Sequence, residues 1–166
     1  MRRNVAQRWM VRTLASVAVI TAAIAVSWAQ DAEPKSLELG QVPKPVMSAV
    51  LKRFPEAKPQ SAVQGVDNNK PFIDVHCLVK GQKIWVTCDP SGAIQAVDRE
   101  ITPKELPGVV TTALNKKYPQ ATIRMVNEIV EGSAPEYDIA LTFQKKAIIA
   151  VFAASGEFVE ELPDES

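Results

Sequence analysis

The sequence is poor in the residue types that most enzymes and metal centres use. Its 166 residues contain one histidine, two cysteines and seven glycines, and only 6% are aromatic. A zinc finger needs more cysteine or histidine ligands, and a disulfide-dense scaffold needs more cysteines. The 19 basic side chains are balanced by 19 acidic ones. This balance excludes a protein that binds nucleic acid by neutralising many phosphates.

The segment Met1–Ala29 has the pattern of a signal peptide. It carries four arginines and no acidic residue, and an apolar run extends over Leu14–Val26. Small residues, Ser27 and Ala29, stand three and one positions before the expected cleavage site. The run is shorter than the roughly 20 residues that cross a bilayer as a stable helix. We therefore expect cleavage after Ala29 rather than a retained anchor, and a periplasmic or secreted protein.

Cleavage at this position changes the charge of the chain. All four lost charges are basic, so the mature chain keeps 19 − 4 = 15 basic residues against 19 acidic ones, a net charge of −4. Mild negative charge favours solubility and opposes binding to anionic lipid surfaces. We expect residues 30–40 to be an N-terminal linker, and no membrane span to remain after cleavage.

The rest of the sequence matches itself at one constant offset, without a gap. Phe54–Ala57 aligns with Tyr118–Ala121, and Ser91–Gly92 aligns with Ser155–Gly156. Chance matches would not keep one register through helix, strand and turn signals alike. We therefore predict two tandem repeats, which cover residues 41–100 and residues 101–164.

Each predicted repeat begins with a helix and continues as strands. Apolar residues line one face at helical spacing, at Val46, Ala49, Val50 and Phe54 and again at Val110, Ala113, Leu114 and Tyr118. Pro55 and Pro119 end these helices, because proline lacks the backbone donor. After each helix the apolar residues alternate with a period of two, which is typical of strands.

The predicted fold class is α+β, with two tandem repeats that each pack one helix on a four-stranded antiparallel sheet. Units of about 60 residues are marginally stable alone, because they bury so little surface. Side-by-side packing could join the two sheets into one continuous eight-stranded sheet. Such a sheet would bury more surface and would remove two exposed edges.

The second unit resembles the PepSY-like family, which is also described as β-lactamase-inhibitor-like. The resemblance is carried by Leu106-Pro107, Tyr118-Pro119, a strand that begins at Tyr137 and the late Ser155-Gly156 turn. The pattern is looser in the first unit, where Phe54 replaces the tyrosine. The family implies a helix packed on an antiparallel sheet, used twice. In the inhibitor that gives the group its name, a tandem pair forms a curved sheet whose concave face grips an enzyme.

The residues do not predict an enzyme or a metal centre. His76 is the only histidine, so a Ser-His-Asp or Cys-His arrangement would have to use it. The sequence also contains no Gly-x-Ser-x-Gly elbow. Asp74, His76 and Asp89 could gather around a metal ion, but a site needs three or four ligands with defined geometry. We expect no catalytic residue, no metal and no cofactor.

Cys77 and Cys88 are predicted to lie on adjacent strands and on the same face. A disulfide is plausible in an oxidising compartment if the register brings their Cα atoms within about 7 Å. Alternatively, both are free cysteines that pack as small hydrophobes, since the equivalent positions of the second unit are Leu141 and Phe152. The sequence leaves both interpretations open.

The opposite face of these strands is the predicted protein-binding face. The alternation places six side chains on it, namely Phe72, Asp74, His76, Leu78, Trp85 and Thr87. Aromatic residues flanked by polar ones on an exposed sheet are typical of a binding hot spot. Trp85 is the only tryptophan left after removal of the signal peptide. The alternative interpretation is that Trp85 packs against a loop or against the other unit.

We therefore predict an exported, non-enzymatic module that binds a protein in the cell envelope. One candidate partner is an exported hydrolase, which the module would inhibit. Nucleic acid is not expected as a partner. Two alternatives stay open: a small-ligand or metal-binding envelope protein, and a purely structural envelope component. A family resemblance supports a fold more strongly than a function.

Overall fold

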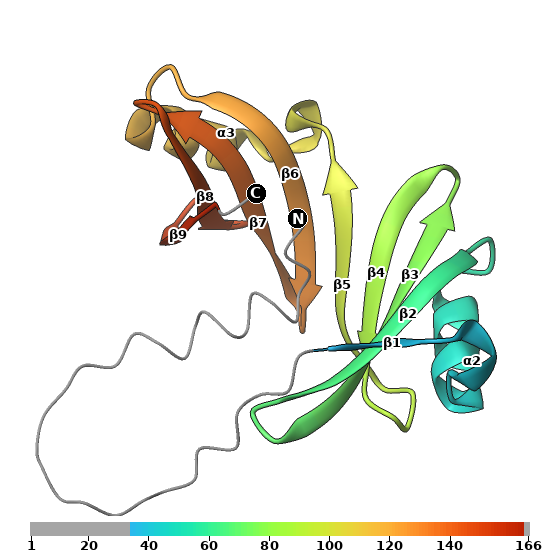
Figure 1. Ribbon diagram of the computed structural model, residues 1–166. Coiled ribbons are helices and arrows are strands. Elements are labelled where there is room, and N and C mark those ends of the chain that lie inside the picture. Colours follow the sequence, from blue (N-terminus) through green and yellow to red (C-terminus); the bar gives the residue numbers. More distant parts are fainter. Residues whose placement is uncertain (1–33, 165–166) are drawn as a thin grey trace, which may run out of the picture.

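The computed structural model describes residues 34–164, so the predicted signal peptide lies outside the described residues. Nine strands form one antiparallel sheet, and each strand pairs with its neighbours in chain order (Figure 1). The strands are β1 (Lys35–Leu37), β2 (Lys58–Asp67), β3 (Lys70–Val79), β4 (Gln82–Cys88), β5 (Ile94–Ile101), β6 (Thr122–Glu131), β7 (Ala134–Phe143), β8 (Lys146–Ala153) and β9 (Phe158–Pro163). The helices are η1 (Leu39–Gln41), α2 (Lys44–Arg53), η2 (Pro103–Glu105) and α3 (Gly108–Lys117).

The sheet is continuous, as the packing argument suggested, but it has nine strands where eight were predicted. The additional strand is β1, which lies within the segment that was predicted to be a linker. It pairs with β2 from Lys35 opposite Gln64 to Leu37 opposite Ala62. Leu37 is buried in the core under α2. A strand of three residues with one buried side chain is too short to show an alternating pattern.

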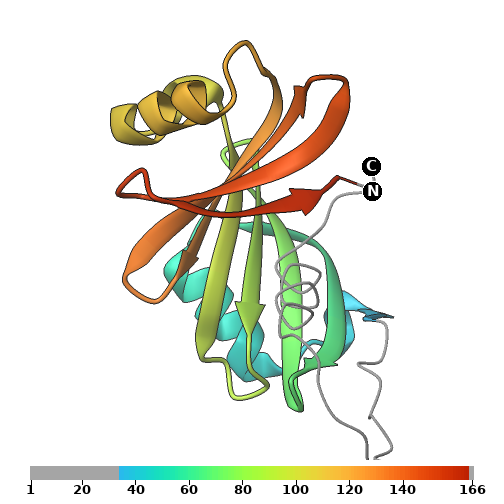
Figure 2. The ribbon, with the colours of Figure 1, turned by 90° about the vertical axis from the view of Figure 1, so that its left-hand side faces the viewer.

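Both α-helices pack on the same face of the sheet (Figure 2). One row of cross-strand neighbours on this face crosses six strands, through Cys77, Ile84, Arg99, Glu128, Tyr137 and Phe152. Cys77 belongs to the core under α2, and Phe152 belongs to the core under α3. Neighbours that are directly opposite in a sheet share a face. The two helices therefore cover one face, at the two ends of the sheet.

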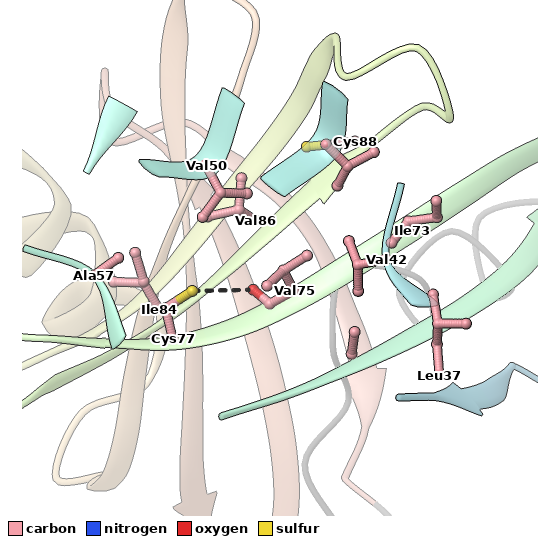
Figure 3. Packing of buried hydrophobic residues seen from close by; sticks show 12 residues of the cluster. Leu37, Val42, Val50, Ala57, Ile73, Val75, Cys77, Ile84, Val86 and Cys88 are labelled. Carbon is pink, nitrogen blue, oxygen red and sulfur yellow. Dashed lines mark hydrogen bonds between the residues drawn. The ribbon is translucent and has the colours of Figure 1, made fainter. Parts of the chain in front are cut away.

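Each helix has its own apolar core. Under α2, Val46 and Val50 are completely buried against side chains of β3 and β4 (Figure 3). Under α3, Val110 and Leu114 are buried against side chains of β7 and β8. The bounds of α2, β2 and β3 and those of α3, β6 and β7 differ by one and the same offset at both ends.

The two Ser-Gly turns contact the first turn of each helix. A Cβ atom on Gly92 would lie 2.6 Å from the carbonyl oxygen of Pro45, and one on Gly156 would lie 2.9 Å from that of Val109. Both glycines also have a positive φ, of 92° and 85°. Only glycine allows this backbone conformation together with such a close approach. These turns thus fix the distance between the sheet and the helices.

Candidate binding face

The face of the sheet opposite the helices is the candidate binding face, and we call it the open face. Within residues 34–164, both α-helices lie on the other side of the sheet (Figure 2). The cross-strand register places all six predicted residues on the open face, because Asp74 pairs with Thr87 and His76 pairs with Trp85. The predicted alternation along β3 and β4 is therefore correct.

A polar cluster lies at the centre of β2, β3 and β4 on this face. His76 Nδ1 is 3.2 Å from Ser61 Oγ, and His76 Nε2 is 3.6 Å from Asp74 Oδ2. Thr87 Oγ1 donates a hydrogen bond of 3.4 Å to Asp74 Oδ1. Asp74 is completely buried, and a buried carboxylate is tolerated only where donors or an opposite charge compensate for its lost hydration. The hydroxyl group of Thr87 supplies a donor to Oδ1, whereas Asp74 Oδ2 and His76 Nε2 are buried without a hydrogen-bond partner among the described residues.

The cluster also holds Trp85 in place. The indole ring meets the imidazole ring of His76 edge to face, with centroids 5.7 Å apart and an angle of 69° between the planes. This is a preferred geometry for two aromatic rings. Trp85, His76 and Leu78 are half-buried, so part of each side chain is exposed on the open face.

The other three predicted residues are more buried than we expected. Phe72, Asp74 and Thr87 are only 6%, 0% and 6% exposed. Phe72 lies over Gly65 on β2, where a Cβ atom would come within 2.7 Å of the ring. Sequence alternation gives the face of a strand residue but not the extent to which its neighbours cover it. These three residues shape and support the face more than they present contact area.

Ser61, His76 and Asp74 are the residue types of a catalytic triad, but their geometry differs from one. In a triad the carboxylate hydrogen-bonds the imidazole and fixes its tautomer. Here the distance of 3.6 Å between His76 Nε2 and Asp74 Oδ2 is too long for that hydrogen bond. In the part of the chain that the structure describes, three or more His, Cys, Asp or Glu side chains do not gather as metal ligands.

The two cysteines are free and buried. Of the two interpretations that the sequence left open, the structure therefore has the free cysteines and not the disulfide. Cys77 pairs with Ile84, whereas Cys88 pairs with Ile73. The four residue steps from Ile73 to Cys77 span about 13 Å of strand, well beyond the reach of a disulfide. Burial, with a smaller effect of the Asp74 charge, raises the pKa of Cys77 to about 11 and that of Cys88 to about 12. Both thiols therefore stay protonated and unreactive at neutral pH.

The open face becomes acidic where it continues into the second half of the chain. One cross-strand row there passes through Glu100, Asn127, Asp138, Val151 and Glu160. We call this set the acidic row. The row beside it contains Asp98, Ile129 and Glu136. Sequence reasoning missed the acidic row, because its residues lie on separate strands and only the register brings them together.

Ser61 was also missed, for a different reason. The register of β2 against β3 shifts between Pro59 and Ser61, and the same shift occurs between Ile123 and Met125 in β6. A bulge of this kind interrupts the alternation of side chains. The sequence pattern therefore gave no basis for placing Ser61 beside His76.

The fold is similar to that of several solved structures from Bacteroides species. A protein of Bacteroides eggerthii, provisionally named as periplasmic, has a TM-score of 0.62, with 72% of this chain and 87% of that chain covered. A DUF2874 family protein of Bacteroides uniformis has a TM-score of 0.61, with the same coverage. A BLIP-like protein of Bacteroides fragilis has a TM-score of 0.60, with 74% and 89% covered. Each of the three is 17% identical in sequence.

These likenesses establish a BLIP-like α+β fold. No protein-family model and no curated protein matches the sequence, and the comparisons do not link the chain to PepSY-like proteins. The names of the three similar structures do not assign an enzymatic activity to them. Between residues 34 and 164, no helix is both long and apolar enough to cross a membrane.

Proposed function

We propose that this protein is an exported, non-enzymatic module whose open face binds a protein in the cell envelope, with inhibition of an exported hydrolase as one outcome of that binding. The observation that carries the proposal is the position of both helices on one face, which leaves the other face to present the partly exposed Trp85. Export is supported by the signal-peptide pattern of residues 1–29 and by the periplasmic name of a protein with the same fold.

The surroundings of Trp85 are those of an interface hot spot. Tryptophan gives a large contact area at a low cost in conformational entropy, and hot spots favour residues that are already held in place. The edge-to-face contact with His76 restrains the indole before any partner arrives. Leu78 adds apolar area on the same face, and the imidazole offers a polar contact. Together these three residues form the proposed contact patch.

We also infer that the two halves are copies of one unit, as the internal match of the sequence predicts. Two helices and four strands keep the offset of that match at both of their ends. The bulges in β2 and β6 keep it as well, and so do the two turn glycines with their helix contacts. Irregular features have no reason to recur at one spacing by chance.

Site-specific photo-crosslinking tests the proposed binding face. The mature chain, residues 30–166, would carry a photoreactive phenylalanine analogue in place of Trp85 and would be irradiated in envelope extract of the source organism. A matched chain would carry it in place of Leu51, which is 40% exposed on α2. We expect a discrete crosslinked protein from position 85 and none from position 51. The same products from both positions would contradict the proposal.

The identified partner then allows a quantitative test. Truncation of a hot-spot tryptophan costs about 2 kcal/mol or more, so Trp85→Ala is expected to weaken binding by more than about tenfold. Leu51→Ala should leave the affinity within about twofold, because α2 lies away from the open face. If the partner is a hydrolase, its activity should fall on titration with the wild-type chain. Equal affinities of both variants would place the interface elsewhere.

A further inference from the structure

We propose that the contact patch binds a protein segment in which carboxylate side chains flank an apolar one, and that Lys58 and Lys83 recognise those carboxylates. The inference rests on the proposed function and deepens it, since it names the chemistry of the partner. Both lysines lie directly opposite Leu78, Lys58 on β2 and Lys83 on β4. We call Lys58, Leu78 and Lys83 the lysine row.

The lysine row lies at one end of the contact patch. Lys83 and Trp85 are two positions apart on β4 and therefore share its open face. Neighbouring strands are about 4.8 Å apart, so the backbones at the two lysines are about 10 Å apart, with Leu78 between them. Both lysines are exposed and Leu78 is half-buried. Because an ammonium group sits on a flexible four-carbon stem, both charges can reach a segment bound over Leu78.

The accessible charge beside the contact patch is positive. In the part of the chain that the structure describes, neither lysine forms an ion pair. Asp74 and Asp98 also border the patch, but they are 0% and 2% exposed. Glu100, further along β5, is half-buried and already has an interaction partner. A partner that approaches Leu78 therefore meets the two ammonium groups first.

The second half of the chain shows that the fold does not require these side chains. Its register repeats that of the first half, and the row equivalent to the lysine row consists of Thr122, Thr142 and Ala147. The row equivalent to Ser61, His76 and Trp85 consists of Met125, Ala140 and Ile149. The same strands and the same bulge thus form without a lysine pair or a tryptophan. The combination of two lysines with Trp85 is therefore better explained by recognition than by folding.

A segment with carboxylates on both sides of an apolar side chain complements this surface. Carboxylates accept charge-assisted hydrogen bonds from ammonium groups, which have donors and no acceptor. The apolar side chain would pack on Leu78 and Trp85, which are only partly buried, and would remove their exposed area from water. Opposite charges around such a contact also accelerate association, whereas a basic segment would bring like charges together.

A pair of synthetic peptides tests the proposal while the natural partner is still unidentified. In the probe, two glutamates precede and two follow a central leucine. The matched control replaces each glutamate with glutamine, which has nearly the same shape but no charge. Both would be titrated against the mature chain, residues 30–166, and followed by its backbone amide signals in NMR spectra. We expect the glutamate peptide to bind at least about fivefold more tightly, to shift signals around Leu78 and Trp85, and to lose this advantage as salt rises.

Matched variants locate the binding, and the second half of the chain supplies substitutions that suit the fold. Lys58→Thr with Lys83→Ala installs the residues of the equivalent row. Lys52→Ala with Lys116→Ala removes the same charge from exposed positions on α2 and α3. We expect the first variant to weaken the glutamate peptide about fivefold or more and the second to change it by less than about twofold. Thermal melts would establish that both variants are folded.

Three results would overturn the proposal: equal or absent binding of the two peptides, an unchanged affinity of the lysine-row variant, or an equal loss in both variants. The last result would mean that net charge alone attracts the probe. Shifts of the same signals when the protein alone is concentrated would assign the face to a second copy and would likewise overturn it.

Failure here is distinguishable from failure of the proposed function. A natural partner that crosslinks to position 85 and binds the lysine-row variant as tightly as wild type would leave the binding face valid. That result would refute only the acidic chemistry of the partner.

Discussion

At the scale of single residues, burial decides which side chains of the open face are accessible to a partner. Asp74 and His76 are two positions apart on β3, yet the first is completely buried and the second is partly exposed. The buried carboxylate lies 3.6 Å from the imidazole, and the imidazole meets the ring of Trp85 edge to face. Asp74 therefore belongs to the interior of the open face rather than to the proposed contact patch. Its own charge is not accessible to a partner.

The buried thiols make the stability of the protein sensitive to alkaline pH. Their pKa values of about 11 and about 12 lie above the ordinary value of 9.0, so the folded chain keeps protons that the unfolded chain loses. Stability is therefore fully present below about pH 9 and falls as the pH rises through the folded-state values. We expect the melting temperature to drop clearly between about pH 8 and about pH 10.5.

The variant Cys77→Val with Cys88→Val isolates the thiol contribution. It keeps apolar side chains of similar size but cannot ionise, so its melting temperature should fall less over the same pH interval. Some decrease will remain, because burial raises the pKa of Tyr118 and Tyr137 as well. Identical pH profiles of variant and wild type would show that the thiols do not contribute.

At the scale of secondary-structure elements, the contact between turn and helix sets how each helix sits on the sheet. Gly156→Ala would place a Cβ atom 2.9 Å from the backbone of Val109 and would force an alanine to a φ of 85°. We expect it to lower the free energy of unfolding by about 1–3 kcal/mol, measured by urea denaturation.

Gly108→Ala is the matched control for this prediction. Gly108 is the first residue of α3, and a Cβ atom there would meet no other atom within 4 Å. Because alanine also favours the helical conformation, this change should be neutral or stabilising by up to about 1 kcal/mol. If both substitutions had the same effect, the turn contact would not be the cause.

At the scale of the whole molecule, one strand pair holds the two halves together. The pairing of β5 with β6 runs from Ala96 opposite Glu131 to Ile101 opposite Val126. Each half has a separate core under its own helix, but about 60 residues bury too little surface for robust stability. We expect residues 101–166 alone to show no cooperative thermal transition by circular dichroism, whereas residues 30–166 unfold in one step.

We expect residues 101–166 to be unstable alone because of their exposed sheet edge as well as their small core. Without β5, the six residues of β6 from Val126 to Glu131 would lose their partners on that side and form an unpaired edge, which favours aggregation. A cooperative transition of the fragment close to that of the longer chain would show that each half is an independent domain. The continuous chain and the pairing of β5 with β6 would then be the only links between the two cores.

The sequence predicted those parts of the fold that depend on neighbours in the chain. Helical spacing identified α2 and α3, and alternation placed Asp74 and His76 on the face opposite Cys77 and Cys88. β1 was missed, because three residues are too few for a period. The contact of Ser61 with His76 was missed, because the bulge in β2 interrupts the alternation.

The sequence by itself thus determined the positions of the two α-helices and the faces of the side chains that alternate along β3 and β4. Only the tertiary structure decided the register, and with it the separation of Cys77 from Cys88 and the assembly of the acidic row. The physical reason is distance along the chain. Periodicity acts between residues a few positions apart, whereas Glu100 and Asn127 become neighbours only when β5 and β6 pair in one register.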